Sequence, residues 1–440
     1  MKKYDSYKDS GIEWIGEIPS HWEVKRIRHI ADIYGRIGYR GYTVSDIVFD
    51  ESGAISLSPS NIENQKLNLK SITRITLDKY EESPEIKVFE NDVILVKTAS
   101  VGKATIVSPL NDLATINPQL VVFKNYRINQ KFFYYEIISK IIQEQINQDL
   151  NGGVVNTITQ TSLNNYTVIV PSKNEQSAIA TYLDQKTSEI DRLIADKEEL
   201  LKLYEEEKTA VINQAVTKGI NPKVKMKDSG IEWLGEIPEH WGAVNLKWIS
   251  KIYSGGTPSR NINEYWQDGT IPWLNSGTVN QFFIKEPSEY ITEIALNNSS
   301  AKWIPENSIL IALAGQGKTK GMVAQVLFKC TCNQSMGIIV PNEKIENRFL
   351  LYYLKNNYQN IRNLGGGDKR DGINLEMIGG ISIPLVPLKE QQSIVDFIES
   401  ETTRIDAKIE DTQKLIELLK EYRTALISEV VTGKVKVIQD

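Results

Sequence analysis

The sequence predicts an α/β (α+β) protein in which two globular domains, related by pseudo-twofold symmetry, are separated by two long antiparallel coiled-coil helices. Three observations lead to this fold class. The chain contains near-identical segments 219 residues apart, two long stretches without glycine or proline, and the same order of strands and helices in each half. Internal repeats of this size decide the architecture and are therefore considered first.

The duplication is visible as two pairs of matched segments. KDSGIEWIGEIPSHW begins at Lys8 and KDSGIEWLGEIPEHW at Lys227, and these copies differ at two positions. A second pair closes each half, with VPSKNEQSAIATYLDQKTSEID from Val170 and VPLKEQQSIVDFIESETTRID from Val386. Chance does not produce such matches in the same order. The chain is therefore a tandem duplication, and each copy is a variable block followed by a long helix.

The variable blocks contain the elements of a mixed α/β domain. In the first block, DVILVKTA, KATIVS, LVVFK and NYTVIVP are typical of strands, and a helix is expected over 129–150. The second block repeats this order with SILIALA, GMVAQVLF, MGIIVP, a helix over 346–363 and GGISIPLVP. The shared order predicts that both blocks have the same fold.

The two long helices are predicted from periodicity and from the absence of helix breakers. No glycine or proline occurs between Gln176 and Val216, and apolar residues recur there at spacings of three, four or seven, as they do from Ile394 to Val430. Each helix has about 40 residues and is therefore about 60 Å long. Helices of this length with one apolar stripe need a partner, so we expect them to pair, and a twofold relation makes the pair antiparallel.

The chain can be divided at these matched segments, because Gly219 and Gly433 can end the two helices. The predicted parts are the first block 1–170, the first helix 171–218, a linker 219–226, the second block 227–386, the second helix 387–433 and a C-terminal tail 434–440. Both long helices are therefore expected to follow the block of their own copy directly.

Composition predicts an ordinary cytoplasmic protein. The 440 residues are 41% hydrophobic and 24% charged, and the sequence has neither a signal segment nor an apolar run long enough to span a bilayer. Cys330 and Cys332 are neighbours in one strand and alternate faces, which argues against a disulfide or a zinc site built from them alone. We therefore expect two reduced thiols and no membrane partner.

The net charge of −5 does not exclude a nucleic-acid partner. Each long helix carries ten acidic and five basic side chains, so the helices together account for −10 and the rest of the chain for +5. Polyanion binding depends on local charge rather than on the total. The variable blocks can therefore bind DNA.

ALAGQGKT, which begins at Ala312, approximates the nucleotide-binding pattern G-x-x-x-x-G-K-[ST]. Alanine replaces the first glycine, however, and MVAQVLF after the loop is typical of a strand, whereas a P-loop leads into a helix. We therefore predict that the loop joins two strands. The matching stretch of the first block, ILVKTASVGKATI, does not keep the nucleotide pattern. A P-loop ATPase or translocase is the strongest rival function, and absence of ATP binding and hydrolysis by the purified chain would exclude it.

Candidate DNA contacts are basic, hydroxyl, amide and aromatic side chains in glycine-rich, turn-prone stretches. Arginine can read guanine edges in the major groove and amide side chains can read adenine edges, while cationic loops suit phosphates. In the first block the candidates are Arg36, Tyr39, Arg40, Lys97, Thr98, Ser100 and Lys103. In the second block they are Thr257, Ser259, Arg260, Trp266, Trp273, Asn275, Ser276, Gln316, Lys318, Lys320, Lys369 and Arg370.

No catalytic constellation is evident in the sequence. The string nearest to the Asn/Asp-Pro-Pro-Tyr loop of adenine methyltransferases, NPQL at 117–120, lacks the second proline and the aromatic residue. His21 and His240 stand in the duplicated HW pairs, which favours a structural role, and Glu85-x-Lys87 has no convincing upstream aspartate partner for a nuclease site. We therefore expect no catalytic, cofactor-binding or metal-binding residue in this chain.

Five features together resemble the specificity subunit of type I restriction-modification systems. They are the paired WxGEIPxHW segments, the SGGTPS…YW…IPWLNSG run, the ALAGQGKTKG loop, the GGGDKRDGIN loop, and the PSKNEQ and PLKEQQ helix entries. The resemblance covers nearly the whole chain. It implies two target recognition domains that each read one half of a bipartite, asymmetric site in double-stranded DNA. It also implies that the two helices act as a spacer and dock two modification subunits.

The resemblance further implies which chemistry belongs to partners. The modification subunits would methylate adenine with S-adenosylmethionine, and two restriction subunits would cleave DNA with ATP and Mg²⁺, so the chain itself is expected to be non-catalytic. The first block has YGRIGYRGYTVSD where the second has the family-like GGTPSRN, as expected if the blocks read different half-sites. A duplicated coiled-coil adaptor without DNA affinity is a third alternative, which nucleic-acid retention insensitive to salt would support.

Overall fold

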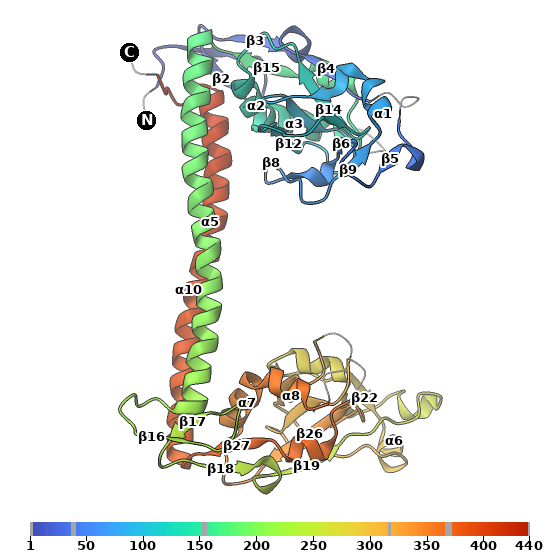
Figure 1. Ribbon diagram of the computed structural model, residues 1–440, viewed down its shortest axis with the longest axis vertical. Coiled ribbons are helices and arrows are strands. Elements are labelled where there is room, and N and C mark those ends of the chain that lie inside the picture. Colours follow the sequence, from blue (N-terminus) through green and yellow to red (C-terminus); the bar gives the residue numbers. More distant parts are fainter. Residues whose placement is uncertain (1–2, 37–40, 152–155, 316–317, 366–371, 439–440) are drawn as a thin grey trace. The chain divides into compact units, whose positions relative to one another are not determined.

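The computed structural model describes residues 3–36, 41–151, 156–315, 318–365 and 372–438 (Figure 1). The chain forms two compact units, of which unit 1 comprises Met1–Glu198 and Lys414–Asp440 and unit 2 comprises Glu199–Gln413. Each unit contains one variable block, the first part of the helix that follows this block, and the last part of the helix that belongs to the other copy.

Two helices occupy the long stretches without glycine or proline, as predicted. Helix α5 extends over Lys173–Lys218 and α10 over Leu388–Val431, with 46 and 44 residues. Gly219 has φ +76° directly after α5, and Gly433 has φ +72° just beyond α10. Glycine adopts this left-handed backbone without steric cost, so it can follow the end of each helix. α5 ends at Lys218, and α10 ends at Val431, two residues before the predicted 433.

The histidine of each duplicated HW pair contacts a glutamate in the first turn of a long helix. Glu175 of α5 accepts hydrogen bonds from Trp22 Nε1 at 3.0 Å and lies 2.9 Å from His21 Nε2. Glu390 of α10 lies at the same 2.9 Å from His240 Nε2. Burial acts to raise the pKa of Glu175, but the hydrogen bonds from Ser172, the tryptophan and the histidine outweigh it and lower the pKa. These contacts assign both histidines to the helix starts.

Within unit 2, the segments of α5 and α10 run in opposite directions. Lys408 Nζ lies 5.3 Å from the centre of the Tyr204 ring, and Arg404 Nη2 donates to Glu207 Oε1 at 3.1 Å. Residue numbers therefore rise along one segment as they fall along the other.

Unit 1 is built around two sheets (Figure 1). The four-stranded antiparallel sheet has the order β12 (Ala104–Ile106), β11 (Val93–Val96), β14 (Leu120–Lys124) and β4 (Asp32–Tyr34). The five-stranded sheet has the order β10 (Lys87–Val88), β13 (Ala114–Ile116), β6 (Ala54–Leu57), β9 (Thr73–Ile75) and β5 (Ile47–Val48), and its β13 and β6 are parallel. Three strand pairs complete the unit: β1 (Tyr7–Asp9) with β2 (Glu17–Pro19), β3 (Glu23–Arg26) with β15 (Thr167–Val170), and β7 (Ile62–Glu63) with β8 (Lys66–Leu67). The strands predicted between 93 and 124 are confirmed.

Unit 2 repeats the larger part of this design. Its five-stranded sheet has the order β19 (Ser250–Ser254), β26 (Met336–Pro341), β23 (Ile309–Ala312), β24 (Val323–Val326) and β21 (Phe283–Ile284). A three-stranded sheet has the order β22 (Glu289–Ile291), β20 (Ile271–Leu274) and β25 (Thr331–Cys332). The remaining pairs are β16 (Met226–Asp228) with β17 (Glu236–Pro238), and β18 (Gly242–Asn245) with β27 (Ser382–Leu385). The strands predicted in the second block are therefore confirmed, in the same order as in unit 1.

The two shorter predicted helices are each divided in the structure. Instead of one helix over 129–150, unit 1 has α2 (Gln130–Ile138) and α3 (Lys140–Asn151). The hydroxyl of Ser139 donates to the carbonyl of Glu136 at 2.8 Å and accepts the N–H of Ile141 at 3.2 Å. Such local side-chain bonds compete with helical ones. In unit 2, the helix predicted over 346–363 is divided into α7 (Asn347–Asn356) and α8 (Tyr358–Asn363). The other α-helices among the described residues are short: α1 (Leu77–Glu81), α4 (Gln160–Asn165), α6 (Glu293–Asn297) and α9 (Leu375–Gly379).

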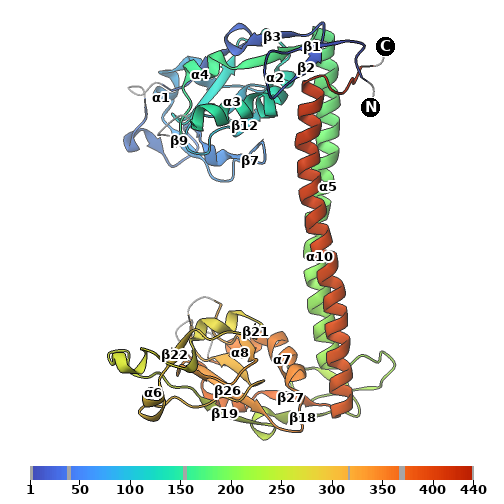
Figure 2. The same ribbon diagram turned by 180° about the vertical axis from the view of Figure 1, so that it is seen from behind.

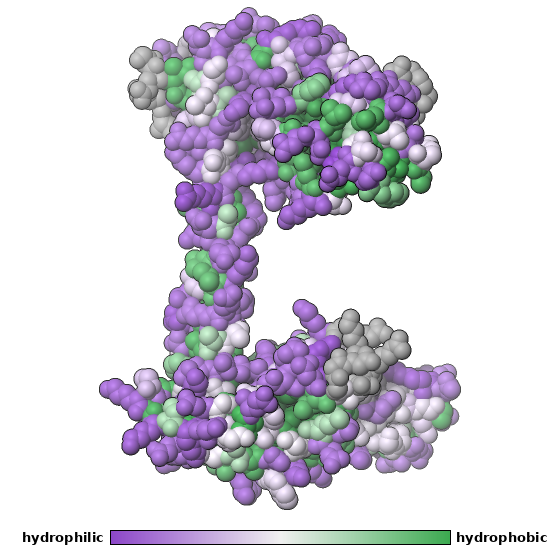
Figure 3. Space-filling view, in the orientation of Figure 1, coloured by the Kyte–Doolittle hydropathy of each residue, from purple (hydrophilic) through white to green (hydrophobic). Residues whose placement is uncertain are grey.

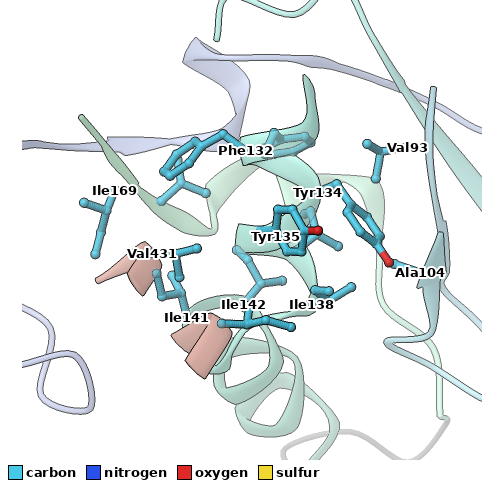
Figure 4. Packing of buried hydrophobic residues seen from close by; sticks show 14 of the residues in the cluster. Val93, Ala104, Phe132, Tyr134, Tyr135, Ile138, Ile141, Ile142, Ile169 and Val431 are labelled. Carbon is cyan, nitrogen blue, oxygen red and sulfur yellow. The ribbon is translucent and has the colours of Figure 1, made fainter. Parts of the chain in front are cut away.

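The core of each unit includes the end of the other copy's long helix. In unit 1, Val431 of α10 lies beside Ile141 of α3, in the same cluster as Phe132 of α2 and Val93 of β11 (Figure 4). In unit 2, α7 lies on the side of the five-stranded sheet that faces the long-helix segments (Figure 2), and Val216 of α5 joins its core. Each globular part is therefore completed by both copies of the repeat.

Candidate nucleic-acid interface

The GQGKT loop connects two neighbouring antiparallel strands. β23 and β24 pair through Ile309 with Gln325 and Ile311 with Val323. A nucleotide P-loop instead leads from a strand into a helix whose N-terminus faces the phosphates. The prediction that this loop joins two strands is confirmed, and the P-loop alternative is wrong for this segment.

Two side chains of α8 hold the base of this loop. Tyr358 Oη donates to the carbonyl of Lys318 at 2.5 Å, and Arg362 Nη1 donates to the carbonyl of Lys320 at 3.1 Å. Lys318 is exposed, whereas Lys320 is only 3% exposed. The side chain of Lys318 is therefore accessible to a ligand. The side chain of Lys320 is buried at the base of the loop in the free chain.

The first block has an equivalent hairpin, formed by β11 and β12, and its turn carries four predicted contacts. Lys103 is exposed, and Thr98 and Ser100 are half-buried. Lys97 is also half-buried, and burial lowers the pKa of its ammonium group. Thr98 Oγ1 lies 3.3 Å from Thr157 Oγ1, so this turn is tied to the segment after α3. The structure therefore brings these four predicted contacts together in one turn.

Arg36 has a different environment from the one that the sequence predicts. Its side chain is buried, with Nε donating to the carbonyl of Ile116 at 3.1 Å and Nη2 donating to Thr115 Oγ1 at 3.2 Å. Burial lowers the pKa of the guanidinium group. In the free chain, Arg36 therefore stabilises β13 from inside the domain.

Three predicted contacts of the second block converge at Arg260, in the segment that follows β19. The guanidinium carbon lies 3.5 Å from the centre of the Trp266 ring and 4.9 Å from that of Trp273. Nη1 and Nη2 donate to the two carboxylate oxygens of Glu289, at 2.5 and 2.9 Å. These donated hydrogen bonds lower the pKa of the Glu289 carboxyl group. The result is a fixed cationic group between an aromatic pair and a carboxylate.

The other candidates of this segment are engaged in local structure. Thr257 Oγ1 is hydrogen-bonded to Gln334 Oε1. Asn275 Oδ1 accepts the N–H of the residue two positions later at 2.8 Å and so caps the 3-10 helix Ser276–Asn280, in which Ser276 is half-buried. Ser259 is exposed. The exposed Ser259 and Asn275 are thus the members of this group most accessible to a ligand.

Five predicted contacts lie outside the described residues, namely Tyr39, Arg40, Gln316, Lys369 and Arg370. Gln316 belongs to the same loop as Lys318, and the other four belong to the YGRIGYRGYT and GGGDKRDGIN stretches. Their contact with DNA stays a prediction, as does that of the exposed candidates described above.

Three supporting residues were not identified from the sequence. Glu289 holds Arg260, and Tyr358 and Arg362 hold the GQGKT loop. Glu289 meets its partner only because β22 pairs with β20, where Glu289 lies opposite Trp273. The nearby aromatic residues are a sequence signal for a cation–π contact with an arginine. No local pattern identifies the carboxylate, which is 29 residues away.

Lys103 of unit 1 and Lys318 of unit 2 each present an exposed cation on a hairpin, which is the kind of group that binds an anion. Arg260 of unit 2 presents a guanidinium paired with a carboxylate, whose remaining N–H donors have the chemistry that matches base edges. Over the part of the chain that the structure describes, no group of three or more His, Cys, Asp or Glu side chains could hold a metal ion. No helix among the same residues is long and apolar enough to cross a membrane.

Comparison with known families gives a match over most of the chain. The model of the type I restriction modification DNA specificity domain matches twice, at residues 19–203 and 238–420. The two matches correspond to the two copies of the repeat, and together they cover more than half of the sequence. The duplication found in the sequence is therefore also a duplication of one known family domain.

Individual relatives agree with this match. The chain is 24% identical to the type I restriction enzyme MjaIX specificity subunit of Methanocaldococcus jannaschii, over 96% of this chain and 95% of that protein. It is 30% identical to the EcoR124I/EcoR124II specificity subunit of Escherichia coli, over 47% of this chain and 50% of that protein. A solved chain from a study of complex assembly and conformational transition of the type I R-M system has a TM-score of 0.69 at 16% identity. That likeness covers 95% of this chain and 99% of the solved one, and it shows a shared fold.

Proposed function

Because the chain belongs to the family of the type I restriction modification DNA specificity domain, we propose that each of its units reads one half of a bipartite, asymmetric site in double-stranded DNA. The chain is a DNA specificity subunit and not itself an enzyme, since catalytic activity in such systems sits on other subunits. The two half-sites differ because the two variable blocks differ.

One observation carries this proposal: a repeated scaffold presents unequal side chains. The strand order β12-β11-β14-β4 of unit 1 recurs as β24-β23-β26-β19 in unit 2. The equivalent hairpins carry Lys97, Thr98, Ser100 and Lys103 in unit 1 and Lys318 in unit 2. A protein with a symmetric scaffold and two different readers suits a split site with unequal halves.

The partners follow from the same assignment. Two modification subunits methylate adenine with S-adenosylmethionine, and two restriction subunits cleave DNA with ATP and Mg²⁺. None of these cofactors is bound by the present chain. Its place is in the cytoplasm, with the DNA that it recognises.

The two long helices form one antiparallel coiled coil with a pseudo-twofold axis between the copies. Support comes from an ion pair that occurs once in each unit: Arg423 Nε donates to Asp191 Oδ1 at 2.8 Å, and Lys208 Nζ lies 2.6 Å from Asp406 Oδ1. Asp191 and Asp406 are equivalent in the two copies, and so are Lys208 and Arg423, at an offset of 215 residues. Each pair is therefore the counterpart of the other. The target recognition domains are 1–170 and 227–386, and the helices 171–218 and 387–433 separate them.

The same helices dock the two modification subunits. Figure 3 shows small hydrophobic areas on an otherwise hydrophilic helix surface. Leu203 in unit 2 is 51% exposed, and its counterpart Leu418 in unit 1 is 60% exposed. Exposed leucines at equivalent positions of a duplication fit two copies of one partner.

The experiment that tests this function is methylation mapping. The chain is co-expressed with its modification subunit in a host without other adenine methylation, and methylated adenines are located by long-read sequencing. We expect one motif with two unequal halves, separated by a fixed number of unspecified bases. A continuous motif, or none, would contradict the proposal. A complex whose retention on DNA does not respond to salt would favour the adaptor alternative.

A further inference from the structure

Arg260 of unit 2 is fixed in orientation by its neighbours. Its guanidinium stacks at 3.5 Å from the centre of the Trp266 ring, and the Trp266 and Trp273 rings are 5.1 Å apart at 90°. Two N–H groups of Arg260 are hydrogen-bonded to both oxygens of Glu289. A planar guanidinium that is both stacked and bonded at two points keeps one plane.

The neighbours of Arg260 are themselves fixed. Trp266 Nε1 donates to the carbonyl of Ser259 at 3.0 Å, and Trp273 Nε1 donates to the carbonyl of Gly256 at 3.2 Å. Glu289 lies opposite Trp273 in the pairing of β20 with β22. The side chain of Arg260 therefore needs little further ordering when a ligand arrives, which lowers the entropic cost of binding.

The carboxylate also changes which ligand suits this arginine. The Glu289 charge offsets the charge of Arg260, so the pair attracts a phosphate much less than a lone arginine does. A guanidinium has five N–H donors, and the carboxylate accepts from two of them. The side chain of Arg260 is 49% exposed and that of Glu289 is 42% exposed, so donors remain accessible. Neutral acceptors such as O6 and N7 of guanine match these donors.

From this geometry we propose that Arg260 reads a guanine edge in the half-site of unit 2, and that Glu289 is the positioning residue that fixes its plane. This inference rests on the proposed DNA-specificity function. It specifies that the base is guanine and that the contact is with a base and not with a phosphate. It also adds Glu289, which is not among the residues predicted from the sequence.

The test uses the complex of the full chain with its modification subunits. Binding to duplexes that carry every single-base substitution of the half-site gives the preference at each position. Arg260→Lys keeps the charge and loses the planar fork, so discrimination for one guanine should fall by roughly 5- to 150-fold. The other positions should stay within about twofold of the original chain.

Glu289→Gln removes the negative charge beside Arg260 while keeping a side chain of similar size, so it tests how the carboxylate positions Arg260. It should reduce discrimination at the same guanine. It should also steepen the dependence of log K on log salt by about 0.9, because the released arginine can then neutralise a phosphate. Loss of discrimination at a different position, or no change in either quantity, would overturn the role of Glu289.

A phosphate contact has a different signature. If Arg260→Ala weakens binding to all sequences alike and makes the salt dependence shallower, the base-reading role is overturned. An Arg260→Lys complex with unchanged base preferences has the same consequence. If the unaltered complex methylates no bipartite motif, the function itself fails, which is distinguishable from either result.

Arg348 provides a matched control within unit 2. It lies on α7, is ion-paired to Glu399, and its guanidinium carbon is 5.1 Å from the centre of the Phe283 ring. Arg348→Lys therefore changes an arginine that, like Arg260, contacts a carboxylate and an aromatic ring, but that faces the long helix α10. It should leave every base preference unchanged, and a guanine preference that falls with this variant as well would overturn the assignment to Arg260.

Discussion

Glu136 is a carboxyl group in the core of unit 1. Its side chain is fully buried, Oε1 accepts the N–H of Ile169 at 2.7 Å, and Oε2 has no hydrogen-bond partner among the described residues. Burial raises the pKa of this carboxyl well above its ordinary 4.5, although the hydrogen bond from Ile169 acts in the opposite direction. The folded chain therefore keeps a proton that the unfolded chain releases.

This difference makes the stability of the chain depend on pH. Above pH 4.5 the unfolded state loses the proton first, so the free energy of unfolding should fall as the pH rises, by up to about 1.4 kcal/mol per pH unit. Glu136→Gln keeps an acceptor for Ile169 and removes the titration. Urea unfolding should show that the free energy of unfolding of the variant, relative to that of the original chain, is higher at pH 8 than at pH 5.5. An unchanged difference between the two proteins would contradict a raised pKa.

Among the described residues of the GQGKT loop, Lys318 has an exposed cationic side chain that a ligand can reach. Lys318→Ala should weaken site-specific methylation and reduce the salt dependence of DNA binding by about 0.9, as expected for one lost phosphate contact. Lys103→Ala is the matched change in the hairpin of unit 1 and should act on the same quantities. If Lys318→Ala instead abolished an ATP-dependent step alone, the loop would have a nucleotide role.

The sequence predicts DNA contacts from residue types and their local surroundings, and neither of these indicates burial. Arg36 and Lys320 have the chemistry of DNA contacts, yet both are buried in the free chain, because their surroundings come from distant segments. Glu289 has no local signature, and only strand pairing brings it to Arg260. Trp266 and Trp273, which the sequence singled out, do meet that arginine.

At the scale of elements, the duplicated ion pair tests the antiparallel arrangement of the helices. Asp191→Arg should cost about 1–3 kcal/mol of stability, because it places like charges beside the largely buried Arg423. Asp191→Arg combined with Arg423→Asp should recover part of this loss, although Lys66 also contacts Asp191 at 3.1 Å. Thermal unfolding of the three proteins measures the effect. A double variant no more stable than the single one would contradict a direct pairing of the helices.

Helices and strands with a clear apolar pattern could be predicted from the sequence, whereas short strands and helix breaks could not. α5 and α10 follow from unbroken apolar stripes, and β23 and β24 from short β-branched runs. The five-stranded sheet of unit 1 consists of strands of two to four residues, too short to show alternation. The break at Ser139 depends on one hydroxyl group that bonds to the local backbone.

For the whole molecule, the sequence predicts two copies, but not that each unit is completed by both. Val430 and Val431 of the second copy are in the core of unit 1, and Ala215 and Val216 of the first copy are in the core of unit 2. Apolar residues near a helix end show that the end is buried, but not against which block. The block against which each helix end packs follows from the tertiary structure alone, in which each long helix ends in the core of the other copy's block.

In the proposed function, two domains read two half-sites and the long helices set the gap between them. Half-sites about one turn of DNA apart, roughly 34 Å, are within the span of helices of this length. Insertion of four residues, about one helical turn, into one long helix adds roughly 6 Å.

Methylation mapping of this insertion variant, co-expressed with its modification subunit, is the most direct test. We expect both half-sequences to be unchanged and the unspecified gap to lengthen by about one or two base pairs, since successive bases are about 3.4 Å apart. An unchanged gap, or altered half-sequences, would contradict the account.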